Sequence, residues 1–203
     1  MQKSKLLFGS TIGIIGGGQL GRMMATTAKH MGYSIVVLDP TPDCPTAQAA
    51  DDQLIAAYDD IDAIRQLTEK CDVITYEFEN VDLQTAQYIE EKGKLPQGTA
   101  SLKITQDREQ EKNKIVESAQ PVAPFKIVQS KAEVQDAIKL VGFPAVLKTC
   151  RGGYDGKGQL KLESETDLVE AAEFVEKICS SIIEQWVLFY KEITIFFTRV
   201  QDG

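Results

Sequence analysis

The sequence has very little histidine, which occurs once, at position 30, in a chain of 203 residues. A nucleophilic triad needs a histidine or a comparable base within hydrogen-bonding reach of its serine or cysteine. His30 lies on the polar side of an expected helix, close to its C-terminal end, where a solvated histidine is favourable. We therefore expect His30 to be solvated, and we do not expect histidine-based nucleophilic catalysis.

Long apolar runs and closely spaced cysteines are also missing. No apolar run reaches the roughly 18 residues that suggest a membrane span, and residues 1–5 do not open a signal peptide. No two cysteines have the spacing of a metal site or a redox motif. We expect reduced thiols in a cytoplasmic protein without a membrane partner. The cysteines are Cys44, Cys71, Cys150 and Cys179.

An excess of basic residues is the third absence. Lysine and arginine together number 22 against 30 acidic residues, so the net charge is −8. An acidic chain repels nucleic-acid phosphates, and we expect no nucleic-acid partner. Any anion that binds must be held by a local site. With 43% hydrophobic residues, the chain can build one large domain or two small ones.

A βαβ unit is predicted near the N-terminus. The buried-strand pattern Thr11–Ile15 runs into Gly16–Gly21, which has the spacing G-x-G-x-x-G, and a helix is expected over residues 22–32. A second strand, Ser34–Asp39, ends in an acid, as in dinucleotide-binding domains. The helix N-terminus would attract an anion. The same turn serves doubly wound domains with other phosphorylated ligands, so a nicotinamide-dependent oxidoreductase is one alternative.

Acidic and amide side chains follow the next predicted strand, Asp72–Tyr76. Its end carries Glu77, Glu79 and Asn80, at the edge where open α/β sheets bind ligands. Glu79 or Asn80 could instead cap the helix expected over Leu83–Glu91. Both interpretations stay open at this point.

The second half begins with a densely charged segment. Residues 102–118 predict one solvated helix with spaced charge pairs. A strand is expected over Phe125–Val128 and a helix over Ser130–Val141. Ser130 and Glu133 have the spacing of a capping box.

A glycine-rich loop, Arg151–Gln159, lies between two predicted strands. The preceding strand ends at Lys148, and the loop contains Lys157 and four glycines. Glycines let the chain turn sharply and bring backbone N–H groups against a ligand. Two lysines beside such a loop suit a polyphosphate. A glycine-rich hairpin with solvated lysines is the alternative.

The last predicted strand runs into a turn signal. After a helix over residues 166–178 and a strand over 181–187, the alternating segment Tyr190–Val200 leads to Asp202 and Gly203. Asp-Gly is a common hairpin turn, so we expect this strand to pair with a returning strand. The sequence therefore predicts a fragment whose last sheet needs further residues.

The order of these elements resembles the ATP-grasp superfamily and, within it, the 5-(carboxyamino)imidazole ribonucleotide synthase family of purine biosynthesis. The resemblance implies an α/β fold, with a Rossmann-like pre-ATP-grasp domain over 1–104 and an α+β ATP-grasp domain over 105–203 that is truncated at its C-terminus. It implies a lid subdomain over about 120–180 and the start of a second subdomain over 181–203. The matching motifs are Gly16–Met23, Thr75–Val81, Gly152–Gln159 and Glu184–Val187.

The resemblance implies an ATP-dependent carbon–nitrogen ligase. Its reaction would carboxylate 5-aminoimidazole ribonucleotide with ATP and bicarbonate, through carboxyphosphate. It implies Mg²⁺ as a cofactor, with metal ligands beyond residue 203 and none within the chain, and a homodimer in the cytoplasm. The chain alone is then expected to turn over poorly.

The resemblance also assigns residues to the nucleotide. Lys148 would hold the α- and β-phosphates, Arg108 would reach the nucleotide from the charged helix, and Glu192 would accept hydrogen bonds from the ribose. The hinge that pairs with adenine would be Glu184, Gln185, Trp186 and Val187. The lid would be Gly153, Tyr154, Asp155, Gly156, Lys157, Gly158 and Gln159.

For the ribonucleotide and the chemistry, the resemblance implies two overlapping sets. Substrate binding would fall to Gln19, Leu20, Glu77, Tyr154 and Lys157. The catalytic residues would be Lys157, Tyr154 and Asp155. Two further alternatives stay open, namely another ATP-grasp ligase such as the formate-dependent glycinamide ribonucleotide transformylase, and a non-catalytic nucleotide-binding module.

Overall fold

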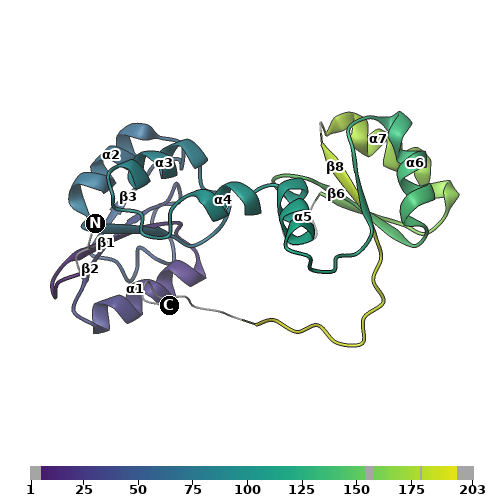
Figure 1. Ribbon diagram of the computed structural model, residues 1–203. Helices are drawn as coiled ribbons and strands as arrows, with labels where there is room; N and C mark the ends of the chain where they lie inside the picture. The colour runs from purple at the N-terminus through teal and green to yellow at the C-terminus, as the bar shows by residue number, and fades with distance from the viewer. Residues whose placement is uncertain (1–5, 154–157, 179, 196–203) are drawn as a thin grey trace. The chain divides into compact units, whose positions relative to one another are not determined.

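The computed structural model describes residues 6–153, 158–178 and 180–195 (Figure 1). The chain divides into two compact units, Met1–Glu111 and Lys112–Gly203, and each is described by itself. Among the described residues, none of the helices combines the length and the apolar character needed to cross a bilayer.

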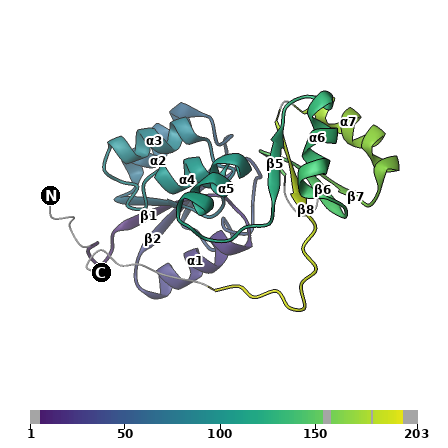
Figure 2. The same ribbon diagram turned by 45° about the vertical axis from the view of Figure 1, so that its right-hand side comes forward.

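Unit 1 is a parallel sheet with helices on both faces. The strand order is β3-β2-β1-β4, and the neighbouring strands pair in parallel. Helix α1 covers one face, and α2 and α3 cover the other (Figure 2). The strands are β1 (Thr11–Ile15), β2 (Ser34–Leu38), β3 (Asp52–Leu54) and β4 (Val73–Tyr76). The helices are α1 (Gln19–His30), α2 (Ile61–Lys70), α3 (Leu83–Glu91) and α4 (Ala100–Thr105).

Alternating side chains of the strands supply the two cores of this unit. Ile14 and Ile35 pack with Ala25 under α1. Ile15 on β1 points to the opposite face, where it joins the larger core that includes Ile64 of α2. Period-two alternation places consecutive residues of a strand on opposite faces, so the all-apolar runs of β1 and β2 are those of a sheet buried on both sides.

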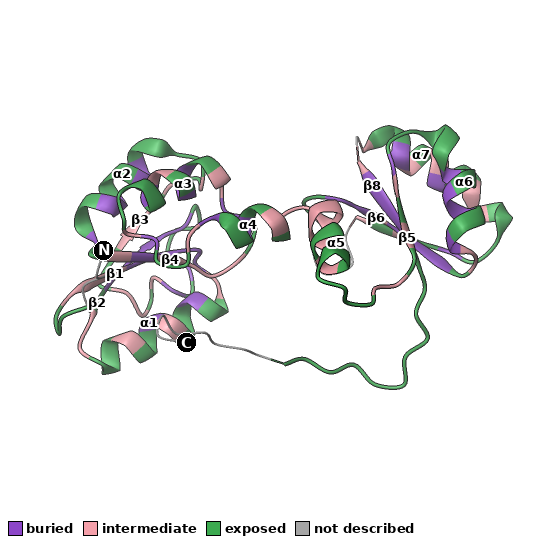
Figure 3. Cartoon of the chain, viewed as in Figure 1, coloured by how far each residue is buried: buried purple, intermediate pink, exposed green. Residues whose placement is uncertain are grey.

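Unit 2 is an antiparallel sheet with two helices on one face. The strand order is β5-β8-β6-β7. The core lies between the sheet and helices α6 and α7, whose inward residues are buried (Figure 3). The strands are β5 (Phe125–Val128), β6 (Ala145–Thr149), β7 (Gln159–Leu162) and β8 (Ser181–Gln185). The helices are α5 (Arg108–Glu117), which contains the division between the units, α6 (Lys131–Val141) and α7 (Leu168–Lys177), which follows a 3₁₀ turn, η1 (Glu165–Asp167).

The single charged helix expected over residues 102–118 is wrong, because two helices, α4 and α5, cover that segment. Gln106 and Asp107 separate them. The Asp107 carboxylate accepts hydrogen bonds from the N–H groups of Glu109 and Gln110, at 3.0 and 3.4 Å, and so opens a new helix.

The expected capping box of Ser130 and Glu133 forms only in part. Ser130 precedes α6, but its side chain makes no capping hydrogen bond. Glu133 accepts a hydrogen bond from the Gln129 N–H at 2.8 Å. A complete capping box occurs instead at Ser164 and Asp167.

The strand expected from Tyr190 is absent over the described residues 190–195. These residues are exposed, and no described strand pairs with them. An alternating pattern makes a strand only when a neighbour satisfies its backbone groups, because unpaired N–H and C=O groups otherwise bond to water. The rest of the predicted strand and the turn at Asp202 and Gly203 lie outside the described residues.

Candidate functional site

The glycine turn of unit 1 is filled by the carboxylate of Glu77. Glu77 follows β4, and its Oε1 accepts the Gly18 N–H at 2.7 Å while its Oε2 accepts the Gly21 N–H at 2.5 Å. Gly16 has φ +110°, and a Cβ there would lie 2.4 Å from Glu77 Cγ. The turn therefore requires glycine, and the anion expected at the N-terminus of α1 is supplied by the protein itself.

Gln19 and Leu20 lie in this turn as the first residues of α1, and both are exposed. They stand between Gly18 and Gly21, the two residues whose N–H groups bind Glu77. The structure thus brings together the three described residues that were predicted to bind the ribonucleotide. Tyr154 and Lys157, predicted for the same site, lie outside the described residues.

Asp39, the acid on which the alternative of a nicotinamide-dependent oxidoreductase rests, is part of the fold. It is buried, and its Oδ2 accepts the Gly17 N–H at 2.7 Å and the Tyr58 hydroxyl at 2.6 Å. Its Oδ1 accepts the Thr41 N–H at 2.8 Å. Burial and the hydrogen bond to Asp39 raise the pKa of Tyr58 well above its usual value. Asp39 therefore stabilises the turn, and this arrangement does not fit a dinucleotide ribose.

Glu79 and Asn80 do not cap the helix that follows them. Both are exposed, and the cap of α3 is Asp82, whose Oδ1 accepts the Thr85 N–H at 2.8 Å. The Glu79 carbonyl accepts a hydrogen bond from Gln106 Nε2 at 2.7 Å. The capping interpretation is wrong for these two residues.

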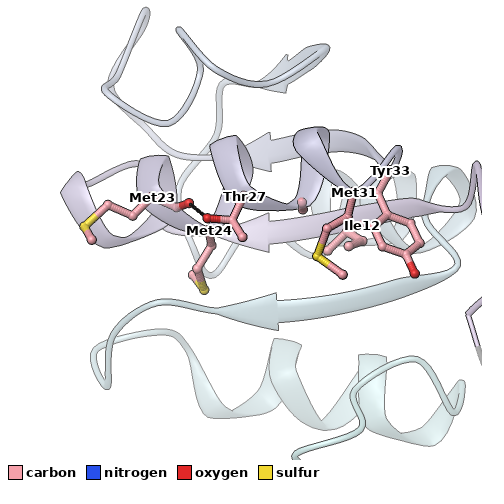
Figure 4. Close-up of a pocket in the computed structure, with 7 residues that line it drawn as sticks. Ile12, Met23, Met24, Thr27, Met31 and Tyr33 are labelled. Atoms are coloured by element: carbon pink, nitrogen blue, oxygen red, sulfur yellow. Dashed lines mark hydrogen bonds between the residues drawn. The ribbon is translucent and has the colours of Figure 1, made fainter.

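A cavity of about 470 Å³ lies along α1 in unit 1 (Figure 4). Its surface is almost entirely apolar, and it contains none of the predicted site residues. The lining residues are Ile12, Met23, Met24, Thr27, Ala28, Met31 and Tyr33.

Unit 2 places a buried carboxylate between two lysines. Glu184 on β8 binds Lys148 of β6 through Oε2 at 2.8 Å and Lys112 of α5 through Oε1 at 3.0 Å. The side chain of Glu184 is 7% exposed, whereas those of Lys148 and Lys112 are 27% and 20% exposed. Two ammonium groups face one carboxylate, so one positive charge is in excess. We call these three residues the lysine–glutamate cluster.

Strand register explains why Lys148 and Glu184 meet. Glu184 on β8 lies opposite Val146 on β6, and Lys148 is two residues after Val146 on β6. The side chains of Lys148 and Glu184 therefore project from the same face of the sheet. Leu147 and Ile183 point to the other face and are fully buried in the core under α6 and α7. The sheet thus has an apolar face that stabilises the unit, and the opposite face carries the cluster together with the buried Val146 and Ile182.

Glu184 is ionised in this setting. Burial raises its pKa, but the hydrogen bonds and charges of Lys148 and Lys112 outweigh burial, and its pKa lies below the ordinary value of 4.5. Sequence reasoning identified Lys148 and Glu184 and missed Lys112. The sequence around Lys112 contains no signal for it, because its helix is polar all round.

The glycine-rich loop joins β6 to β7 beside the cluster. The Thr149 N–H donates to the Gly158 carbonyl at 2.9 Å, and Gly158 has φ +71°, as a close hairpin exit requires. Gln159, the first residue of β7, is paired opposite Lys148. Gly153 is half-buried at the start of the loop. Four predicted lid and catalytic residues lie outside the described part of the chain: Tyr154, Asp155, Gly156 and Lys157.

The hinge residues follow Glu184, and two of their N–H groups are used within the fold. Gln185 donates to the Pro124 carbonyl and Trp186 to the Pro144 carbonyl, both at 2.9 Å. The ammonium of Lys161 lies 4.9 Å from the centroid of the Trp186 ring. Val187 is exposed.

Two further predicted nucleotide ligands, Glu192 and Arg108, lie outside the strands of unit 2. Glu192 is exposed in the unpaired segment after β8. Arg108 is half-buried as the first residue of α5 and belongs to unit 1. Their roles stay predictions.

The described residues contain no group of three or more histidine, cysteine, aspartate or glutamate side chains that could hold a metal ion. Cys44, Cys71 and Cys150 are buried, and Cys179 lies outside the described residues. Burial raises the pKa of Cys71 to about 12, so this thiol is protonated.

Two family models match the chain, one for each part. A ribonucleotide synthetase preATP-grasp domain matches residues 9–106, and an ATP-grasp domain matches residues 110–203. The α/β fold predicted from the sequence is confirmed.

Curated relatives match over nearly the whole chain. The N5-carboxyaminoimidazole ribonucleotide synthase of Bacillus subtilis (strain 168) is 47% identical over 203 residues, which are 100% of this chain and 53% of the relative. The enzyme of the same name from Staphylococcus aureus (strain COL) is 45% identical over 199 residues, 98% of this chain and 53% of the relative. The chain thus spans about half the length of the curated relatives it matches.

Solved structures agree with these matches. N5-carboxyaminoimidazole synthetase from Staphylococcus aureus complexed with ADP has a TM-score of 0.87 and 46% identity, covering 90% of this chain and 49% of that one. The synthase from Aspergillus clavatus in complex with ADP and 5-aminoimidazole ribonucleotide has a TM-score of 0.79 and 26% identity, covering 90% and 48%. By its two domain matches and these relatives, the chain belongs to the ATP-grasp superfamily and, within it, to the N5-carboxyaminoimidazole ribonucleotide synthase family.

Proposed function

We propose that this chain carries the nucleotide and ribonucleotide sites of an enzyme that carboxylates 5-aminoimidazole ribonucleotide with ATP and bicarbonate, in purine biosynthesis. The observation that carries the proposal is the lysine–glutamate cluster beside the glycine-rich loop. The names of the relatives, and the ADP and ribonucleotide bound in the Aspergillus structure, support it. A homodimer in the cytoplasm is part of the same proposal.

The nucleotide belongs to unit 2 in this proposal. Lys148 lies 2.8 Å from the carboxylate of Glu184, the first hinge residue. The excess positive charge of the cluster favours a phosphate. Because the N–H groups of Gln185 and Trp186 already donate within the fold, adenine would pair with other backbone groups of residues 184–187. Glu192 completes the proposed set within unit 2, and Arg108 of unit 1 stays a predicted nucleotide ligand.

The ribonucleotide belongs to the glycine turn of unit 1. Glu77 already fills the N-terminus of α1 with negative charge, so a phosphate group is disfavoured there. A carboxylate instead accepts hydrogen bonds from hydroxyl and amino groups. We therefore assign the ribose or amino portion of the substrate, and not its phosphate, to Glu77 and the exposed Gln19 and Leu20.

The proposed reaction has two steps. A bicarbonate oxygen attacks the γ-phosphorus of ATP, the bond to the β-phosphate oxygen breaks, and carboxyphosphate and ADP form. The amine of the ribonucleotide then bonds to the carboxyl carbon, phosphate leaves, and the amine loses its proton. Carboxyphosphate is unstable in water, so the site must exclude solvent. Tyr154, Asp155 and Lys157 stay the proposed catalytic residues of the lid.

Mg²⁺ would neutralise phosphate charge in such an enzyme. The described residues offer no cluster of acidic side chains that fits the ion. The domain limits 1–104 and 105–203, with a lid over about 120–180, belong to the same proposal.

Two measurements test the function. Calorimetry with ADP should show binding by this chain, and Lys148→Met should abolish it. Phosphate release from Mg-ATP in bicarbonate should be stimulated by 5-aminoimidazole ribonucleotide when the chain is joined to the remainder of the Bacillus subtilis relative. Stimulation by formate with glycinamide ribonucleotide instead would favour the other ligase, and ADP binding without any turnover would favour a nucleotide-binding module. Binding of NADH without ADP would overturn the proposal.

A further inference from the structure

One carboxylate of the nucleotide site has two counter-ions, on different oxygens. Lys148 holds Oε2 of Glu184 at 2.8 Å, and Lys112 holds Oε1 at 3.0 Å. The three residues come from β6, β8 and α5. A carboxylate that is 7% exposed cannot be hydrated well, so it depends on these partners.

Lys112, the second counter-ion, becomes important when Lys148 leaves the Glu184 carboxylate. If Lys148 turned its ammonium group to a nucleotide phosphate, Glu184 would keep only the partner on its other oxygen. A buried carboxylate without any partner is strongly unfavourable, and that cost would oppose nucleotide binding. Lys112 removes this cost, because it binds Oε1 and leaves Oε2 to Lys148.

Phe125 helps to keep the Lys112 ammonium beside Glu184. Phe125 lies directly opposite Glu184 in the β5–β8 pair, so the two side chains share a face of the sheet. The ammonium of Lys112 lies 5.9 Å from the centroid of the Phe125 ring, which favours a cation at that place. The Lys112 side chain is 20% exposed, whereas that of Lys114 in the same helix is 60% exposed and pairs with Glu117 at 3.0 Å.

We propose that Lys112 is a positioning residue of the nucleotide site, which holds the Glu184 carboxylate in place while Lys148 exchanges that carboxylate for a nucleotide phosphate. The inference rests on the proposed function, in which Lys148 binds phosphate. It adds a residue of the charged helix α5 to the site and gives Glu184 a side-chain role in addition to its place in the hinge.

The test is the affinity of this chain for ADP, measured by calorimetry. Lys112→Met should weaken ADP binding about tenfold or more, because Lys148 must then serve both carboxylate and phosphate. Lys112→Arg, which keeps the charge, should restore most of the affinity. Lys114→Met is the matched control from the same helix and should bind ADP as the unchanged chain does.

A double variant separates positioning from general damage. Glu184→Gln removes the buried negative charge, so adding Lys112→Met to it should change the ADP affinity little. The double variant also contains no unpaired buried carboxylate that could prevent folding. Equal ADP affinity of Lys112→Met and the unchanged chain, with binding lost in Lys148→Met, would overturn the role of Lys112 alone. No ADP binding by the unchanged chain would overturn the proposed function and this inference with it.

Discussion

Two glutamates of this chain, Glu77 and Glu184, accept hydrogen bonds from different kinds of donor. Glu77 binds two backbone N–H groups of a glycine turn and is half-buried, whereas Glu184 binds two lysines and is buried. The first stabilises the start of a helix, and the second holds two like charges close together. Each therefore has its own measurable consequence.

Replacing Glu77 by alanine should lower the stability of unit 1. The N–H groups of Gly18 and Gly21 would lose their carboxylate partner at the N-terminus of α1, a loss of about 0.5–2 kcal/mol. Chemical denaturation monitored by circular dichroism would measure the change in the free energy of unfolding. Glu79→Ala is the control, because Glu79 is exposed and its carbonyl group, which the substitution keeps, accepts the hydrogen bond from Gln106. Equal stability of the two variants would contradict the capping role.

The ion pairs of Glu184 should make stability depend on pH in the acid range. Its pKa is lower in the folded state than the ordinary value of 4.5, so the stabilisation is present above that pH and is lost as pH falls through the folded pKa. Glu184→Gln should therefore be less stable than the unchanged chain at neutral pH, and the difference should shrink below about pH 4.5.

Urea denaturation at pH values from about 3 to about 7 would measure this difference in the free energy of unfolding. The control is Glu163→Gln, which breaks an exposed pair with Lys161 at 2.6 Å and should change stability little at any pH. Parallel pH profiles for the unchanged chain and Glu184→Gln would show that the ion pairs do not stabilise the fold.

The candidate site was partly predictable from single residues. Lys148 precedes a glycine-rich loop, and Glu77 follows a strand at the ligand edge of a sheet. The role of Glu184 in the hinge was implied by the family resemblance. Lys112 was not predictable, because its partner is 72 residues away in the sequence (184 − 112). A charged residue in a polar helix is indistinguishable from a solvated one until tertiary contacts are known.

At the scale of elements, local patterns predicted the strands β1 and β5 and the helix α3 with their observed limits. Short apolar runs, and the charged residue or glycine at the end of an element, are local features that the sequence contains. The break between α4 and α5 is different, since it depends on where the chain returns to the loop after β4. Gln106 Nε2 donates to the carbonyls of Glu79 and Val81, at 2.7 and 2.6 Å.

Gln106→Ala should therefore destabilise unit 1. Removal of both hydrogen bonds leaves two carbonyl groups without this partner and should cost about 1–3 kcal/mol. Thermal unfolding would measure it as a lower midpoint. Lys103→Ala in the exposed face of α4 is the control and should leave the midpoint unchanged. An unchanged midpoint in Gln106→Ala would mean that water replaces the amide.

At the scale of the whole molecule, each unit has its own core, and each contains some of the predicted site residues. The cores are formed by separate sets of buried residues, one under α6 and α7 and the others on the two faces of the parallel sheet. The chain spans about half the length of its relatives. The activity of these relatives therefore involves residues that have no counterpart in this chain, whereas stability and ligand binding can be measured on this chain.

Ile183→Ala should loosen unit 2. Ile183 is fully buried among α6, α7 and the sheet, and truncating it should cost about 2–5 kcal/mol. Hydrogen exchange followed by mass spectrometry should show faster exchange in peptides of β5, β6 and β8. Peptides of β1 and β2 should keep their protection, because they belong to other cores. Equal loss of protection in both units would mean that the chain unfolds as one cooperative body.

Trp186 gives the hinge a property that the rest of the chain lacks. It is the single tryptophan of the sequence, its backbone N–H donates to the Pro144 carbonyl, and the Lys161 ammonium lies 4.9 Å from the centroid of its ring. Indole emission shifts with the charge and the water around the ring, so light emitted by tryptophan in this protein comes from one known place. The hinge thus contains an intrinsic fluorescent reporter. A nucleotide base that bound there would shift the emission wavelength of Trp186 without any added label.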